Sequence, residues 1–191
     1  MNLRELVANA KLRFSQRQMV KETFSFPYAL LKPKQILVCL PAGLRELTLV
    51  KQYLPALTGL FGNANVTLLT LPGVRVTDIF PRKGFQILTP NPDQVGWSGL
   101  PKKTYVKQLQ GYNFDVILDL NLEPSVFTSG ILLNFPHAIR IGRGNHLGEP
   151  YYNVEIKTKF LRDERNIYRS LFETLATITH GTPPTTMVTE Q

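Results

Sequence analysis

A β-α-β pattern in residues 35–71 constrains the fold of this 191-residue chain more than any other feature. Residues 36–40 form an uninterrupted apolar run, and the lack of polar alternation predicts a strand buried on both faces of a sheet. Residues 44–61 follow with apolar side chains at helical spacing. The segment "NVTLLTL", residues 65–71, then predicts a second strand, parallel to the first and joined to it by a right-handed crossover.

The alternation of strands and helices continues towards residue 180. Further strands are predicted at residues 112–120, 138–142 and 154–158, and further helices at residues 103–110, 124–134 and 161–179. Residues 72–101 are less regular: "VRVTDIF" and "FQILTP" each suit a strand, with a turn signal at residues 82–84 between them. We therefore expect an α/β domain at residues 35–180, with a Rossmann-like, mostly parallel sheet flanked by helices, and a disordered tail at residues 181–191.

A basic helical extension precedes this domain at residues 1–34. It holds seven Lys or Arg residues against two Glu, which is +5 of the chain's net charge of +8. A helix is predicted over residues 2–22, with one apolar stripe formed by Leu3, Leu6, Val7, Ala10 and Phe14. Two interpretations stay open: the stripe packs on the domain or on a partner, or the helix makes a peripheral contact with an anionic membrane.

Composition narrows the class of protein. Cys39 is the single cysteine, so we expect a small buried apolar side chain and a reducing, cytoplasmic location. No apolar run reaches the roughly 18 residues that span a bilayer, and the N-terminus lacks a signal-peptide core, so we expect a soluble chain or one peripheral at the inner membrane face. Metal-ligand spacings, a P-loop and a dinucleotide fingerprint are missing, so no cofactor is expected. Basic residues are not interleaved with aromatic ones, which disfavours nucleic acid as a partner.

Polar or glycine-rich turns follow three of the predicted strands, at residues 41–46, 119–123 and 142–148. Because the carboxyl ends of parallel strands meet at one edge of a sheet, we expect these turns to form a ligand-binding edge. Basic side chains near the third turn suit an anion. The alternative is that the acidic residues stabilise helix N-termini and that the basic loop is simply solvated.

Three segments resemble the N-terminal half of glycosyltransferase family 9, the heptosyltransferase-like proteins. They are "ILVCLPAGLREL", "YNFDVILDLNLEPSVFTSGILLNFPHAIRIGRG" and "RDERNIYRSLFETLATI", in the family's order, and they span residues 35–180. The resemblance implies the acceptor-binding half of a two-domain GT-B enzyme, which transfers a sugar from a nucleotide donor to a lipid-linked acceptor. It also implies that Glu46 occupies the position of the catalytic acid, the general base on the acceptor hydroxyl, without a metal.

Two residues depart from the family pattern. Arg45 stands where the family has a small glycine, and Glu46 is one methylene longer than the family's aspartate. A displacement of about 1 Å at a reacting group can cost orders of magnitude in rate. Because the sequence stops at Gln191, we also expect no donor-binding domain in this chain. We therefore expect a divergent, stand-alone, non-catalytic domain, a partner-binding or assembly subunit that contacts another protein or a copy of itself.

The alternative is an acceptor-binding subunit of a hexosyl or heptosyl transferase whose donor domain belongs to another chain. Glu46 would then be the base, and the ligand would be an anionic sugar or a nucleotide-sugar. The candidate ligand-binding residues are Gly43, Arg45, Asp119, Arg140 and Arg143.

Overall fold

The computed structural model describes residues 3–19, 22–25, 28–74, 76, 79–80, 84–144 and 147–180, and the tail predicted at residues 181–191 lies outside them. A six-stranded sheet forms the centre, with the order β3-β2-β1-β4-β5-β6 and parallel pairing between all neighbours. The strands are β1 (Gln35–Cys39), β2 (Asn65–Leu69), β3 (Gln86–Leu88), β4 (Val116–Asp119), β5 (Ile139–Arg143) and β6 (Val154–Ile156). This strand order is that of a doubly wound Rossmann sheet.

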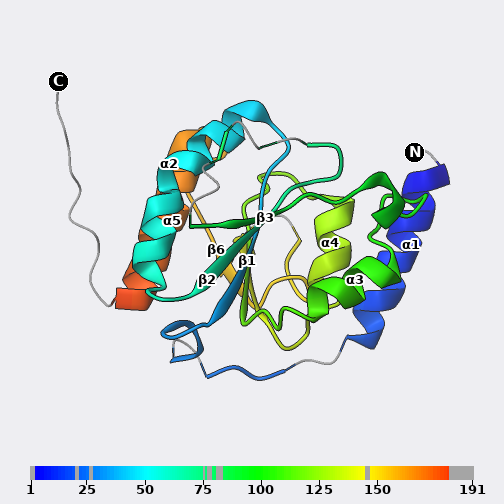
Figure 1. The fold of residues 1–191 in the computed structure, drawn as a ribbon, viewed down its shortest axis with the longest axis horizontal. Coiled ribbons are helices and arrows are strands. Elements are labelled where there is room, and N and C mark those ends of the chain that lie inside the picture. Colours follow the sequence, from blue (N-terminus) through cyan, green and yellow to red (C-terminus); the bar gives the residue numbers. More distant parts are fainter. Residues whose placement is uncertain are drawn as a thin grey trace.

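Helices cover both faces of the sheet (Figure 1). On one face lie α2 (Leu44–Leu60) and α5 (Glu164–His180), and on the other lie α1 (Leu3–Gln18), α3 (Lys103–Gln110) and α4 (Val126–Leu132). Short 3₁₀ helices are present at Tyr28–Leu30 and Pro92–Gln94. Among the described residues, no helix has the length and apolar character needed to cross a membrane.

The apolar core is divided by the sheet into two clusters. Side chains alternate along β1, so Ile36 and Val38 pack in the cluster beneath α2 and α5, while Leu37 and Cys39 pack in the cluster beneath α3 and α4. Because both faces are covered, β1 and β4 read as continuous apolar runs. Each fully buried side chain of this size stabilises the fold by about 1.5–3 kcal/mol relative to exposure.

The predicted α/β, Rossmann-like sheet is confirmed, and the predicted helices and strands of residues 103–180 occur within a few residues of their expected bounds. Of the two irregular segments, "FQILTP" supplies the edge strand β3. In "VRVTDIF", the described residues Val74, Val76, Ile79 and Phe80 form no strand, and the buried Val76 and Phe80 pack into the core instead. The turn expected at residues 82–84 lies mostly outside the described residues.

One of the expectations for α1, that its apolar stripe packs on the domain, is wrong. The helix contacts the body of the protein through Ala8 and Leu12, which are buried, whereas Leu3, Leu6 and Phe14 are exposed. The helix has apolar residues on two opposite sides, and the side with fewer of them, Ala8 and Leu12, packs on the domain. The longer stripe faces outward.

Candidate functional site

The carboxyl edge of the sheet at β1 and β4 is the candidate site. β1 pairs with β2 on one side and β4 on the other, so the strand order reverses between β1 and β4. The chain leaves β1 for α2 on one face and leaves β4 for α4 on the other (Figure 1). Open α/β sheets bind ligands in the crevice at such a switch point. The turns after β1 and β4 and the described residues that follow β5 therefore lie at one edge of the sheet, and ligand binding at this edge stays a prediction.

Glu46 lies in the first turn of α2 and folds back on the start of its own helix. Gly43 is the N-cap residue of α2, and a Cβ added there would lie 2.9 Å from Glu46 Oε2. Partial burial raises the pKa of Glu46, a hydrogen bond from the Gly43 backbone N–H lowers it, and the carboxylates of Glu164 and Glu123 raise it. This contact is half of a capping box, in which an N3 Glu accepts from the N-cap backbone N–H.

Arg45 joins the first turns of α2 and α5. Its Nε lies 3.0 Å from Glu164 Oε2, and its own side chain is largely exposed. The ion pair crosses between helices that already pack together, since the rings of Tyr53 and Phe172 stack at 4.8 Å. An exposed pair of this kind stabilises by about 1 kcal/mol at most.

Asp119 ends β4 and is buried beneath the edge, with hydrogen bonds from two neighbours. Its Oδ1 accepts from the Asn121 backbone N at 3.0 Å and from Asn121 Nδ2 at 2.6 Å, and its Oδ2 accepts from the Tyr152 hydroxyl at 2.8 Å. Burial and the neighbouring carboxylate raise the pKa of Tyr152, so the hydroxyl remains a donor. Asp119 does not cap α4, because Ser125 Oγ accepts from the Thr128 backbone N at 3.3 Å instead.

Arg143 ends β5 at the same edge and donates to backbone carbonyls. Its Nη2 lies 3.3 Å from the carbonyl oxygens of Phe160 and Leu161, and its Nη1 lies 3.5 Å from that of Leu122. The side chain is 8% exposed. The guanidinium therefore fastens the loop after β6 to the loop after β4.

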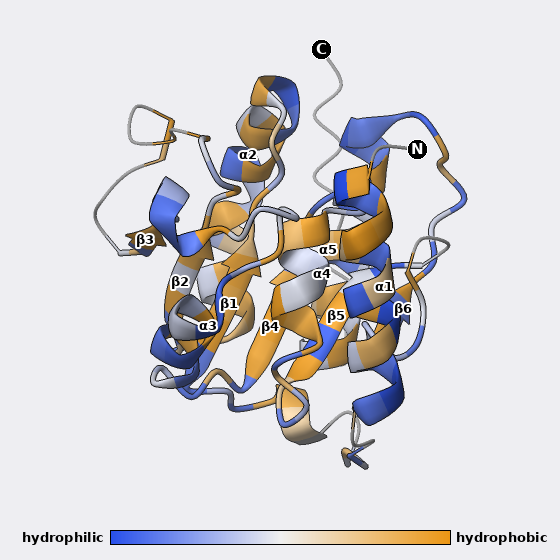
Figure 2. Cartoon of the chain, turned by 90° about the vertical axis from the view of Figure 1, so that its right-hand side faces the viewer, coloured by the Kyte–Doolittle hydropathy of each residue, from blue (hydrophilic) through white to orange (hydrophobic). Residues whose placement is uncertain are grey.

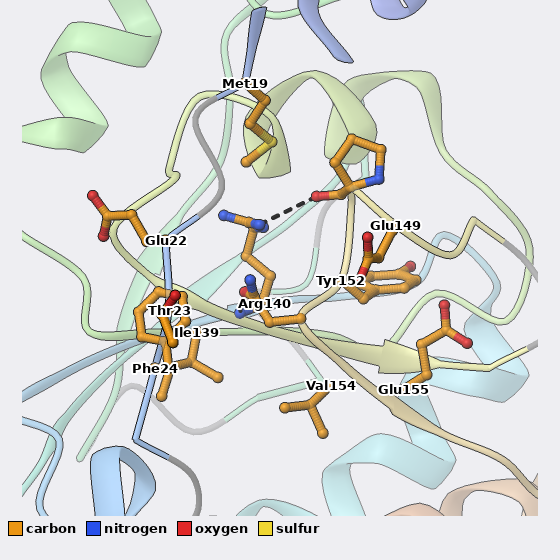
Figure 3. Close-up of a pocket in the computed structure, with 12 residues that line it drawn as sticks. Met19, Glu22, Thr23, Phe24, Ile139, Arg140, Glu149, Tyr152, Val154 and Glu155 are labelled. Atoms are coloured by element: carbon orange, nitrogen blue, oxygen red, sulfur yellow. Dashed lines mark hydrogen bonds between the residues drawn. The ribbon is translucent and has the colours of Figure 1, made fainter. Parts of the chain in front are cut away.

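Arg140 does not join the other candidates, which corrects the expectation that it lies at the ligand edge. Its Nε, Nη1 and Nη2 donate to the carbonyls of Tyr151, Phe135 and Pro150 at 2.9, 2.7 and 3.2 Å, the last bond being the dashed line in Figure 3. These carbonyls precede the strands β5 and β6, so the guanidinium is directed away from the carboxyl edge. Burial lowers the pKa of Arg140 to about 10, and the nearby Glu22 raises it.

A hollow of about 620 Å³ lies over Arg140 (Figure 3). Met19 and residues 22–24 contribute one wall, and the loop before β6 contributes the other. The acidic side chains of Glu22, Glu149 and Glu155 lie around it. Their charge disfavours an anionic sugar at this position.

Several residues of the edge carry no signal in the sequence. Tyr152 reaches Asp119 from 33 residues away, and Tyr168 of α5 donates from its hydroxyl to the Leu120 carbonyl at 2.9 Å. Only Asn121, two residues after Asp119, was near enough to be suspected. Among the described residues, no group of three or more His, Cys, Asp or Glu side chains is placed to hold a metal ion. Cys39 is buried, as expected.

The fold is similar to about half of two solved glycosyltransferase structures, in line with the resemblance in sequence. No protein-family model matches the chain, and no curated protein matches it in sequence. Among solved structures, heptosyltransferase WaaC of E. coli with ADP is similar, with a TM-score of 0.54 and 16% identity over 80% of this chain and 49% of that one. A family 9 glycosyl transferase from Veillonella parvula DSM 2008 has a TM-score of 0.55 and 17% identity over 81% of this chain and 44% of that one. The chain thus spans about half the length of these structures.

Proposed function

We propose that this chain is a glycosyltransferase-like domain that binds a partner protein or assembles with its own copies, and does not itself catalyse sugar transfer. The observation that carries this proposal is that the polar groups of the inherited ligand edge have partners within the chain. Asp119 accepts from Asn121 and Tyr152, Arg143 donates to three carbonyls, and the Glu46 carboxylate is held at its own helix N-terminus.

Competition from these internal bonds disfavours ligand binding. A sugar hydroxyl or phosphate that engaged Asp119 or Arg143 would have to replace bonds that already satisfy a buried charge. Hydrogen bonds to charged groups contribute about 1.5–3 kcal/mol each, and a buried group left without a partner costs a similar amount or more. A ligand would therefore need to restore every bond that it displaces before it gained any affinity.

The test uses the purified chain with ADP and with an ADP-sugar as probes, because ADP is the nucleotide bound in a similar structure. We expect no saturable binding in calorimetry and no release of ADP when a sugar acceptor is added. Light scattering after gel filtration should give a mass above the 21.6 kDa of a monomer, either alone or with a co-purified protein. Sugar transfer by the chain alone would refute the proposal, as would a monomer without any partner.

A second candidate is an acceptor-binding subunit that works with a donor domain from another chain. It is favoured by the position of Glu46 at the switch point and by its raised pKa, which suits a proton acceptor. Glu46→Gln retains the shape and a hydrogen-bond acceptor for Gly43 but cannot take a proton. Transfer by the reconstituted pair should fall by at least about 100-fold. Glu123→Gln, a neighbouring carboxylate, is the control, and an equal loss in both variants would count against Glu46 as the base.

A further inference from the structure

The outward side of α1 carries exposed apolar residues that nothing in the described structure covers. Leu3, Leu6 and Phe14 are 67%, 49% and 61% exposed. At 3.6 residues per turn they fall within about 80° of the helix circumference, opposite to the buried Ala8 and Leu12. Figure 2 faces this side of the protein, with α1 in front of the sheet. Large exposed apolar side chains gathered on one surface mark an interaction site.

A groove beside α1 extends this surface. It has a volume of about 870 Å³ and lies between α1, the loop at residues 96–102 and α3. Phe14 and Trp97 both line it, and Trp97 is 64% exposed. A Cβ added at Gly99 would lie 3.4 Å from Arg4 Nη2, so the loop follows α1 back towards its first turn. Ala10 and Phe14 of the apolar stripe line the groove together with Trp97, so the stripe and Trp97 share one surface.

Basic residues surround the exposed apolar side chains. The groove is lined by four lysines, Lys11, Lys102, Lys103 and Lys107. Arg13 borders the stripe on its other side, Arg17 lies within it one turn after Phe14, and both arginines are exposed. α1 has one acidic residue, Glu5. We call the surface made by Leu3, Leu6, Phe14 and Trp97 with these lysines and Arg13 the α1 face.

We propose that the α1 face docks on the surface of a bilayer that contains anionic phospholipid. α1 lies in the plane of the membrane, with the leucines, Phe14 and Trp97 at the boundary between headgroups and acyl chains. The lysines contact the phosphates. Exposed Leu, Phe and Trp flanked by Lys and Arg are typical of a helix that lies in this interface. A helix of 16 residues provides about 24 Å of contact along its axis.

Charge favours this occupant over the others that an apolar face allows. A second copy of the chain would oppose one basic face to another, and like charges repel. Nucleic acid would neutralise the lysines but would leave Leu3 and Leu6 without an apolar partner. An anionic bilayer offers negative headgroups and an apolar layer at the same surface. This inference goes beyond the proposed function and does not depend on it.

The test is sedimentation of the full chain with vesicles of one part phosphatidylglycerol to two parts phosphatidylcholine, at low salt, against vesicles of phosphatidylcholine alone. We expect binding to the first and none to the second, with affinity falling as salt is raised. Lys103→Gln with Lys107→Gln should weaken binding by about fivefold for each charge removed. Phe14→Ala with Trp97→Ala should weaken it by roughly tenfold or more.

Matched controls lie outside the α1 face. Leu161→Ala removes a side chain that is 73% exposed, and Lys51→Gln with Arg169→Gln removes two exposed charges from α2 and α5. These variants should bind vesicles as the wild type does. Equal binding to neutral and anionic vesicles, no binding to either, or an equal loss in the controls would overturn the proposal. In particular, no binding to either vesicle would assign the α1 face to a protein partner instead.

Discussion

The hydrogen bond between Tyr152 and Asp119 gives the sharpest test of the internal network at the candidate site. The Tyr152 hydroxyl donates to Asp119 Oδ2 at 2.8 Å, and both residues are less than 5% exposed. Tyr152→Phe removes this donor but keeps the ring, which packs directly over Gly142. The variant therefore isolates the bond from the packing.

The expected cost follows from the charge and burial of the acceptor. A hydrogen bond to a charged group contributes about 1.5–3 kcal/mol, and water does not readily replace the donor because the carboxylate is 2% exposed. For a chain of this length, 1 kcal/mol corresponds to about 2–4 °C in the melting temperature. Tyr152→Phe should thus lower the free energy of unfolding in urea by about 1.5–3 kcal/mol and the melting temperature by about 3–12 °C.

Tyr112→Phe is the matched control. Its hydroxyl accepts from Gln86 Nε2 at 3.1 Å in an exposed position, and its ring stacks on Phe114 at 5.5 Å. Because water replaces this bond, the change should stay within about 0.5 kcal/mol. If Tyr152→Phe lowers the free energy of unfolding no more than Tyr112→Phe does, the inference that internal donors satisfy Asp119 is wrong. The main support for the proposal of a non-catalytic edge is then lost.

Three further outcomes are expected. Gly142→Ala should strongly lower the free energy of unfolding in urea, because the added Cβ would lie 2.3 Å from the Tyr152 ring. Gly59→Ala is the control: Gly59 is an exposed residue of α2 with open space around it, so the change should raise the free energy of unfolding by about 0.5–1 kcal/mol. Partial burial raises the pKa of Glu46 from 4.5, so the folded state binds this proton more tightly and wild-type stability falls as pH rises from 4.5 through the raised pKa. Glu46→Gln should lack that fall when urea midpoints are compared across pH. Cys39, with a pKa raised by burial, should react with a thiol reagent only after unfolding, and rapid reaction in the native state would contradict its placement.

The sheet was predictable because its strands are buried on both faces. β1 and β4 lie between two helical layers, so residues 36–39 and 116–118 are all apolar and make the strands visible as apolar runs. α5 was predictable for a related reason: Ile167, Leu171 and Leu175 recur at helical spacing because that side of the helix packs on the sheet. The least regular stretch, residues 72–101, contains the short edge strand β3, whose exposed and half-buried residues give only a weak apolar pattern.

The orientation of α1 could not be predicted from its apolar pattern. Leu3, Leu6 and Phe14 form the longer stripe, and periodicity alone assigns the longer stripe to the core. The residues that pack, Ala8 and Leu12, are fewer, and the small side chain of Ala8 allows close approach to the domain. Spacing along a helix identifies apolar sides, but shape decides which of them is covered. The longer stripe of α1, with its basic neighbours, is therefore exposed, although packing on the domain was one of the expectations.

The roles of the charged candidates were not predictable because residue type alone does not separate a ligand site from a structural clamp. Asp119, Arg140 and Arg143 are all less than 10% exposed, and a buried charge is tolerated only when hydrogen bonds satisfy it. The nearest backbone carbonyls and side chains supply those bonds, so burial itself commits these groups to the fold. The lysines of the α1 face differ from these buried groups, because Lys103 and Lys107 are exposed and their charges are solvated by water. We therefore expect anions to bind at the exposed lysines of α1 and α3 before they bind at the carboxyl edge of the sheet.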